Sequence, residues 1–151
     1  MQQFIGTKVI NAKPMNLADY NILRGWELPS DQDGTDEGFL VEYLDGGQAN
    51  VAGYLGYVSW SPKEVFENSY NESGSLTFGD ALVILKAGGK VARAGWNGKG
   101  MFVFLDTPPN RDEPFSCTDP YVSMFTAQGT FQPGWLCSQA DMLASDWCAV
   151  D

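Results

Sequence analysis

Glycine and proline interrupt this sequence so often that no long helix or strand fits between them. The 151 residues include 17 glycines and 8 prolines, which predicts many turns. Hydrophobic residues make up 44% and aromatic residues 13% of the chain, which is enough for a packed core and argues against disorder. The sequence therefore predicts an α+β fold with short helices and small antiparallel sheets.

Capping residues mark where helices begin. Caps and apolar spacing predict helices over residues 17–23, 62–70, 78–87 and 139–143. The corresponding caps are Asn16, Ser61, Thr77 and Ser138. The last three are each followed three residues later by an acidic residue, which is the spacing of a capping box.

Apolar runs between these helices predict strands. They lie over residues 4–10, 39–44, 54–60, 91–94, 101–105, 121–126, 130–132 and 147–150. The dipeptide Asn97-Gly98 predicts a type I′ hairpin turn between the fourth and fifth of these strands.

A short polar segment divides the chain into two similar-sized modules. Residues 71–75 (NESGS) are the best linker candidate, and they separate an acidic α+β module, residues 1–72, from a second α+β module, residues 75–151. In each half an arginine is closely followed by Gly-Trp, at Trp26 and at Trp96, and a glycine-led apolar strand comes later. This repeated order leaves two interpretations, an internal duplication or coincidence between two tryptophan-rich modules, and the different spacing from helix to tryptophan favours coincidence.

Charge and composition argue against several classes of function. The formal net charge is −10 and the 9 basic residues are scattered, so no nucleic-acid partner is expected. The chain has no histidine, which removes the Ser-His-Asp triad, the Cys-His pair and most zinc catalysis. Cys117, Cys137 and Cys148 form no Cys-x-x-Cys motif, so we expect reduced thiols, no metal site and no cofactor. Without a signal peptide or a long apolar run, we expect a soluble cytoplasmic protein with no membrane partner.

The turn around Trp96 is the first candidate binding element. Asn97, Gly98, Lys99 and Gly100 offer backbone N–H groups with little side-chain obstruction, and Lys99 adds a positive charge. Trp96 offers an aromatic face on which a base could stack. The alternative is an ordinary hairpin turn beside a core tryptophan.

The predicted helix start after Trp135 is the second candidate. Ser138, Gln139 and Asp141 lie where unsatisfied backbone N–H groups suit anions or hydroxyls, and Asp141 could accept hydrogen bonds from ribose. The alternative is that Ser138 and Asp141 form only a capping box.

A third set of residues consists of carboxylates that flank a proline-rich loop over residues 107–119. The set comprises Asp106, Asp112, Glu113 and Asp119. Paired acids could serve a hydrolase or a metal ion, but no spacing fixes their geometry, so a solvated loop is the preferred interpretation. A further alternative function is an adaptor that binds a host or virion protein through the acidic first half.

The second half resembles a known family. The segments LTFGDALVILKAGGKVARAGWNGKGMFVFL and GWLCSQADMLASDW, within residues 75–151, are similar to the phage Thoeris anti-defence proteins of the second type. The first half, through RGWELP, DEGFLVEYLDGG and SWSPKEVFE, resembles a phage module to which we attach no activity.

The resemblance implies a nucleotide sponge and not an enzyme. Such proteins sequester bacterial immune messengers, namely cyclic ADP-ribose isomers and in some members cyclic dinucleotides, without cleaving them. They assemble as homo-oligomers, dimers or commonly tetramers, with pockets between subunits.

The resemblance also implies roles for individual residues. Trp96 and Asn97 would meet the ligand by stacking and amide hydrogen bonds, beside a turn shaped by Gly98, Lys99 and Gly100. The facing wall would consist of Trp135, Ser138, Gln139 and Asp141. Asp146 and Trp147 would anchor the tail.

Overall fold

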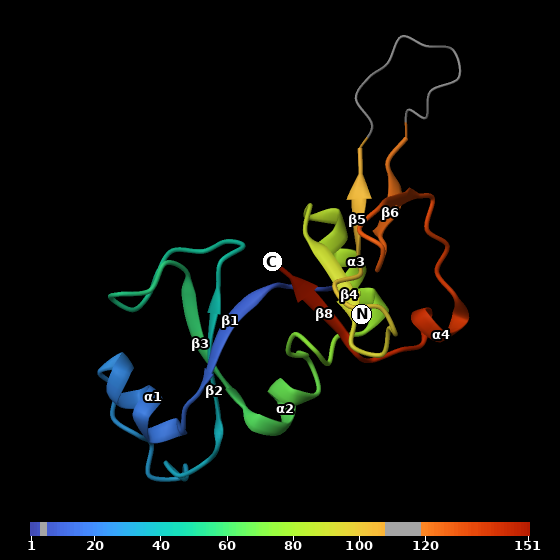
Figure 1. Cartoon of the computed structure of the whole chain (residues 1–151). Helices are drawn as coiled ribbons and strands as arrows, with labels where there is room; N and C mark the ends of the chain where they lie inside the picture. Colours follow the sequence, from blue (N-terminus) through green and yellow to red (C-terminus); the bar gives the residue numbers. More distant parts are fainter. Residues whose placement is uncertain (4–5, 108–118) are drawn as a thin grey trace. The chain divides into compact units, whose positions relative to one another are not determined.

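The chain folds into two compact units, each with its own antiparallel sheet. The computed structural model describes residues 1–3, 6–107 and 119–151, and the units are Met1–Tyr70 and Asn71–Asp151 (Figure 1). Short helices accompany both sheets, so the predicted α+β fold is confirmed. Most of the acidic loop over residues 107–119 lies outside the described residues. This part includes Asp112, Glu113 and Cys117.

The first unit is a three-stranded meander with two helices. Its strands are β1 (Ile10–Pro14), β2 (Gly38–Tyr43) and β3 (Tyr57–Pro62), in the order β1-β2-β3, and its helices are α1 (Leu17–Arg24) and α2 (Lys63–Glu67). The Asn16 side chain accepts from the Asp19 backbone N–H at 2.7 Å, and Gly25 ends α1 at a φ of 66°, so both predicted helix boundaries are confirmed. Tyr20 of α1 packs on Leu40 and Val58 to form the centre of the core.

The predicted bounds of two elements in the first unit are wrong. Of the residues predicted as a strand over 4–10, residues 6–9 form none, and β1 runs from Ile10 through Pro14. Pro14 is tolerated because β1 is an edge strand. The predicted cap Ser61 and first helical residue Pro62 belong instead to β3, where Ser61 pairs with Phe39 of β2. Strand pairing thus delays α2 to Lys63, without a side-chain cap.

Side chains satisfy backbone groups at the open edge of β3 and in the loop before it. The Asn50 amide donates to the Val58 carbonyl at 2.8 Å and accepts from the Val58 N–H at 2.7 Å, as a neighbouring strand would. The buried Glu42 carboxylate accepts from the backbone N–H groups of Leu55 and Gly56 at 2.7 and 3.1 Å. Polar side chains therefore satisfy backbone groups that a fourth strand would satisfy in a larger sheet.

The second unit is a five-stranded antiparallel sheet with two helices. Its elements are α3 (Phe78–Lys86), β4 (Lys90–Arg93), β5 (Phe102–Asp106), β6 (Tyr121–Phe125), β7 (Phe131–Pro133), α4 (Gln139–Met142) and β8 (Trp147–Val150). The strand order is β7-β6-β5-β4-β8, so the C-terminal strand pairs with β4 (Figure 1). The predicted capping boxes at Thr77 and Ser138 are both present.

The core of the second unit lies between α3 and one face of its sheet. Leu85 of α3 packs with Val91, Val103 and Trp147 of three neighbouring strands, and Trp147 is fully buried. The other face carries phenylalanine rings in mutual contact, from Phe102 on β5 to Phe131 on β7. None of the helices in the described part of the chain is both long and apolar enough to cross a membrane.

The predicted type I′ turn is wrong. Such a turn needs positive φ at both Asn97 and Gly98, whereas in the fully described loop 94–101 only Gly100 has a positive φ, of 70°. β4 and β5 pair only at Lys90 and Val91, so the strands separate well before the loop. The connection is therefore a wide loop and not a tight turn.

The two Gly-Trp corners occupy different structural positions. Arg24, Gly25 and Trp26 end a helix, with Trp26 53% exposed. Arg93 ends a strand, and Trp96 follows within a loop and packs on the core. The similarity of these two motifs therefore does not correspond to a shared local structure.

The Asn50–Val58 pairing makes a first prediction. Asn50→Ala should leave the Val58 N–H without its acceptor and lower the free energy of unfolding by roughly 1–3 kcal/mol. Asn50→Asp keeps an acceptor for the Val58 N–H but places a carboxylate oxygen against the Val58 carbonyl, so it should also lower stability while protecting the Val58 N–H from exchange better than Asn50→Ala does. Urea unfolding gives the free energies, and amide hydrogen exchange should show faster exchange at Val58. Unchanged exchange at Val58 in Asn50→Ala would contradict this role.

Candidate functional site

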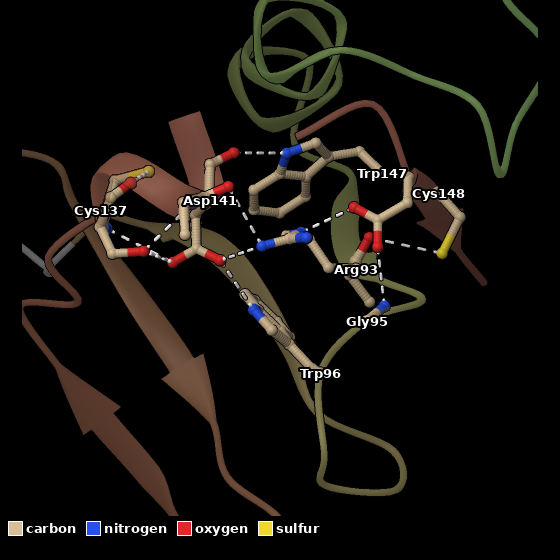
Figure 2. Close-up of polar contacts among 11 residues, drawn as sticks. Arg93, Gly95, Trp96, Cys137, Asp141, Trp147 and Cys148 are labelled. Atoms are coloured by element: carbon tan, nitrogen blue, oxygen red, sulfur yellow. Dashed lines mark hydrogen bonds and ion pairs between the residues drawn. The ribbon is translucent and has the colours of Figure 1, made fainter. Parts of the chain in front are cut away.

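Arg93 lies at the centre of a polar network in the second unit (Figure 2). Its Nη1 donates to Asp141 Oδ1 at 2.7 Å, and its Nε donates to Asp146 Oδ1 at 2.7 Å. Nη1 also donates to the carbonyl of Ala140 at 3.3 Å. The side chains of Arg93 and Asp141 are 17% and 13% exposed, whereas that of Asp146 is 32% exposed, so the ion pair with Asp141 is the better shielded from water.

Local structure brings these three residues together. Arg93 is the last residue of β4 and pairs in register with Trp147, the first residue of β8, which places Asp146 beside it. Asp141 stands in the first turn of α4, where the Ser138 hydroxyl accepts from its backbone N–H at 3.1 Å. The capping box thus sets the direction of the Asp141 carboxylate.

Three tryptophans pack edge to face around this network. The Trp96 ring lies 6.0 Å from Trp135 and 5.5 Å from Trp147, between centroids, and Trp135 lies 6.2 Å from Trp147. Trp96 Nε1 donates to Asp141 Oδ1 at 3.0 Å, and Trp147 Nε1 donates to the Asp141 carbonyl at 3.0 Å (Figure 2). Trp147 is buried, whereas Trp96 and Trp135 are half-buried.

The Asp141 carboxylate is fully engaged within the chain. Oδ1 accepts from Arg93 and Trp96, and Oδ2 accepts from the Ser138 hydroxyl at 2.6 Å and the Ser138 N–H at 3.3 Å. Burial alone would raise the pKa of Asp141, but the hydrogen bonds from Ser138, Arg93 and Trp96 outweigh it and lower the pKa to about 2. Asp141 is therefore ionised throughout the physiological range.

The pKa values of the groups next to Asp141 are shifted as well. The hydrogen bond from Arg93 lowers the pKa of Asp146, and hydrogen bonds to both carboxylates raise the pKa of the Arg93 guanidinium. Burial raises the pKa of the Cys137 thiol, which keeps it protonated and weakly nucleophilic at neutral pH. The network is thus a set of fixed charges.

The loop after Trp96 presents the remaining candidate groups. Asn97, Lys99 and Gly100 are exposed. A Cβ on Gly98 would collide with the Met101 sulfur and lie 2.8 Å from the Ala127 Cβ, so this position needs glycine for close packing. The loop is therefore held at Gly98 while its neighbours face water.

The structure brings part of the predicted site together. Trp96, Trp135, Ser138 and Asp141 form one connected cluster, and the exposed Gln139 begins α4 beside it. The capping-box interpretation of Ser138 and Asp141 is confirmed. Arg93 was not predicted as a site residue, although an arginine two residues after the buried Val91 on the same strand could have indicated an acidic partner.

Of the four loop carboxylates, Asp106 and Asp119 lie within the described residues. Asp106 accepts from the Ser123 hydroxyl at 3.4 Å on the sheet, and Asp112 and Glu113 lie outside the described residues. Within residues 1–3, 6–107 and 119–151, no three His, Cys, Asp or Glu side chains are grouped as metal ligands.

Comparison with known proteins matches the unit that contains this network. The family described as the Thoeris anti-defense 2-like domain matches residues 76–150. The curated protein Thoeris anti-defense 2 of Bacillus phage SP01 is 37% identical over 85 residues, which cover 50% of this chain and 94% of that protein. This chain therefore covers almost the whole relative, and the family match lies within the second unit.

The low pKa of Asp141 predicts how stability depends on pH. The unfolded chain, with an aspartate pKa near 3.9, takes up a proton at higher pH than the folded one, so the stabilisation is complete above about pH 4 and is lost as pH falls towards 2. Asp141→Asn should remove this part of the pH dependence and lower stability at neutral pH. Urea unfolding from pH 7 to pH 2 measures both effects.

Ser138→Ala is the matched variant for this experiment. It keeps the carboxylate but removes the hydroxyl donor to Oδ2, so the pH dependence should become smaller without vanishing. If Asp141→Asn and the unaltered protein lose stability in parallel over this pH range, the pH dependence does not come from this carboxylate.

Proposed function

The chain belongs to the Thoeris anti-defense 2 family of phage anti-defence proteins, and from that membership we propose that it sequesters a nucleotide messenger of bacterial immunity without cleaving it. The proposed ligands are cyclic ADP-ribose isomers and, as a second class, cyclic dinucleotides. The protein would act in the cytoplasm of the infected host by lowering the concentration of free messenger.

One observation carries this proposal. Trp96 is held by a hydrogen bond to an ionised carboxylate and by edge contacts with two other tryptophans, and it stands directly before an exposed glycine-containing loop. A fixed indole beside accessible backbone N–H groups suits a ligand that has both a planar base and phosphates. Rigid groups of this kind bind without a large loss of conformational entropy.

We assign the predicted site residues to two sides of the ligand. Trp96 would stack on a base, Asn97 would hydrogen-bond through its amide, and Lys99 would meet a phosphate in a loop shaped by Gly98 and Gly100. The other side would consist of Trp135, Ser138 and Gln139. Asp141 has a different part in this proposal, because its four hydrogen bonds come from the chain itself, so it would hold the wall in place without contacting ribose.

Sequestration sets a requirement on affinity. Protein sites must outnumber messenger molecules and bind them well below the concentration that signals, which corresponds to a Kd of roughly 1 nM, or about −12 kcal/mol. Each buried polar ligand atom left unpaired would cost about 1–3 kcal/mol, so such a site needs many polar contacts and no turnover.

Trp96→Ala tests the binding site. It should weaken binding of a cyclic ADP-ribose isomer by roughly 5- to 140-fold, because aromatic stacking on a base is worth about 1–3 kcal/mol. Isothermal titration calorimetry measures the affinity. Mass spectrometry of the ligand released by denaturing the complex should recover it unchanged.

Trp26→Ala is the matched control. Trp26 also follows a glycine, is 53% exposed and lies in the first unit, so its replacement should leave affinity unchanged. Equal losses in the two variants would place binding elsewhere or show a general effect on folding. Time-dependent loss of the ligand would identify an enzyme instead of a sponge.

We also propose that the protein is a homo-oligomer. The chain has a mass of 16.5 kDa, so light scattering coupled to size exclusion should give two or four times that mass at micromolar concentration. A mass of one chain, both with and without ligand, would contradict a pocket shared between subunits.

A further inference from the structure

We propose that Arg93 is a positioning residue, which orients the Trp96 indole through Asp141 and does not bind a ligand phosphate. An arginine beside a nucleotide site would ordinarily be taken as a phosphate clamp, because its fork of N–H donors matches phosphate oxygens. The geometry around Arg93 supports a different role. The part of this proposal that concerns a ligand rests on the proposed function, whereas the part that concerns Trp96 does not.

The positive charge of Arg93 is already balanced within the chain. Its guanidinium lies 2.7 Å from one oxygen of Asp141 and 2.7 Å from one oxygen of Asp146. With the Ala140 carbonyl, three of its five N–H donors are used. Two carboxylates against one guanidinium leave this cluster with a net charge of about −1, which repels a phosphate.

Arg93 and Trp96 share one acceptor atom. Both the Arg93 Nη1 and the Trp96 Nε1 donate to Asp141 Oδ1, at 2.7 and 3.0 Å. The ion pair with Arg93 therefore holds Asp141 Oδ1 in place, and this oxygen in turn holds the Trp96 indole. Edge contacts with Trp135 and Trp147 restrict the remaining freedom of the ring, so its exposed part keeps one orientation.

The second ion pair holds the backbone on which Trp96 stands. Asp146 Oδ1 accepts from Arg93, while its Oδ2 accepts from the Gly95 N–H at 2.7 Å. The Asp146 carbonyl also accepts from the Ala94 N–H at 3.1 Å. Arg93 thus acts on Trp96 twice, on the indole through Asp141 and on the preceding backbone through Asp146 (Figure 2).

Lysine cannot replace arginine here with the same result. The planar guanidinium reaches two carboxylates that lie on different sides of it through Nε and Nη1, whereas an ammonium is a single point charge on a flexible stem. Arg93→Lys therefore keeps the charge and loses the geometry. The Arg93→Lys variant therefore distinguishes a positioning role of Arg93 from a purely electrostatic one.

The test compares Arg93→Lys and Asp146→Asn in the full chain by two measurements. In nuclear magnetic resonance spectra, the Trp96 indole Nε1–H signal should shift in both variants, because its acceptor is displaced. For Arg93→Lys, which keeps the charge of the cluster, calorimetric titration with a cyclic ADP-ribose isomer should show affinity reduced about tenfold, which equals about 1.4 kcal/mol, by the same factor at low and high salt. For Asp146→Asn, which removes a negative charge, the indole signal is the readout.

Lys99→Ala is the matched control for a phosphate contact. Lys99 is exposed and lies in the loop beside Trp96, so its removal should lower affinity mostly at low salt and leave the indole signal in place. An Arg93→Lys variant that behaves like Lys99→Ala, or one that leaves the indole signal unmoved, would overturn the positioning role.

The two measurements also separate this proposal from the proposed function. If the unaltered protein binds none of the messengers, the proposed function fails, while the indole signal still decides whether Arg93 orients Trp96. If Arg93→Lys does not fold, Asp146→Asn decides the same question, because it removes one ion pair and retains an oxygen that can accept from Gly95.

Discussion

The Asp141 carboxylate is the interaction on which the second unit depends. It closes the capping box of α4, binds Arg93 at the end of β4, and accepts from the indole of Trp96. These contacts join a four-residue helix, too short to be stable alone, to the sheet and to the loop before β5. The low pKa of the carboxylate follows from the same contacts, so the charge that organises the site is present at every physiological pH.

The network is stable because no charge in it is left without a partner. Removing an ion from water is costly, and a shielded pair is favourable only when its other polar atoms are also satisfied. Here Ser138 and Gly95 donate to the two carboxylates, and the Ala140 carbonyl accepts a third hydrogen bond from the guanidinium. Among the described residues, no buried side-chain nitrogen or oxygen lacks a hydrogen-bond partner. The cluster therefore favours one arrangement of its loops.

Local signals in the sequence predicted local structure correctly where the contacts are local. Contacts between distant residues explain why the Ser61 cap was wrong and why Arg93 was missed. Asn16, Thr77 and Ser138 bond to a residue three positions away, so their caps could be predicted. Ser61 carried the same signal but pairs with Phe39, a contact that no local pattern contains. Arg93 likewise meets acids 48 and 53 residues away, and only the pairing of β4 with β8 reveals them. The candidate residues around Trp96 were predicted, whereas the arginine that holds them was not.

The negative charge of the chain bears on how an anionic ligand could be held. A formal net charge of −10 repels nucleotides at long range, although salt limits that repulsion to about 8 Å at physiological ionic strength. Around Trp96, Asp141 and Asp146 are paired with Arg93, while Lys99 in the neighbouring loop is exposed. In the proposed binding mode, a phosphate meets the loop and a base meets Trp96. Because Asp141 and Asp146 are paired with Arg93, the negative charge next to Trp96 is partly neutralised. An anionic ligand is therefore compatible with this surface although the protein as a whole is strongly acidic.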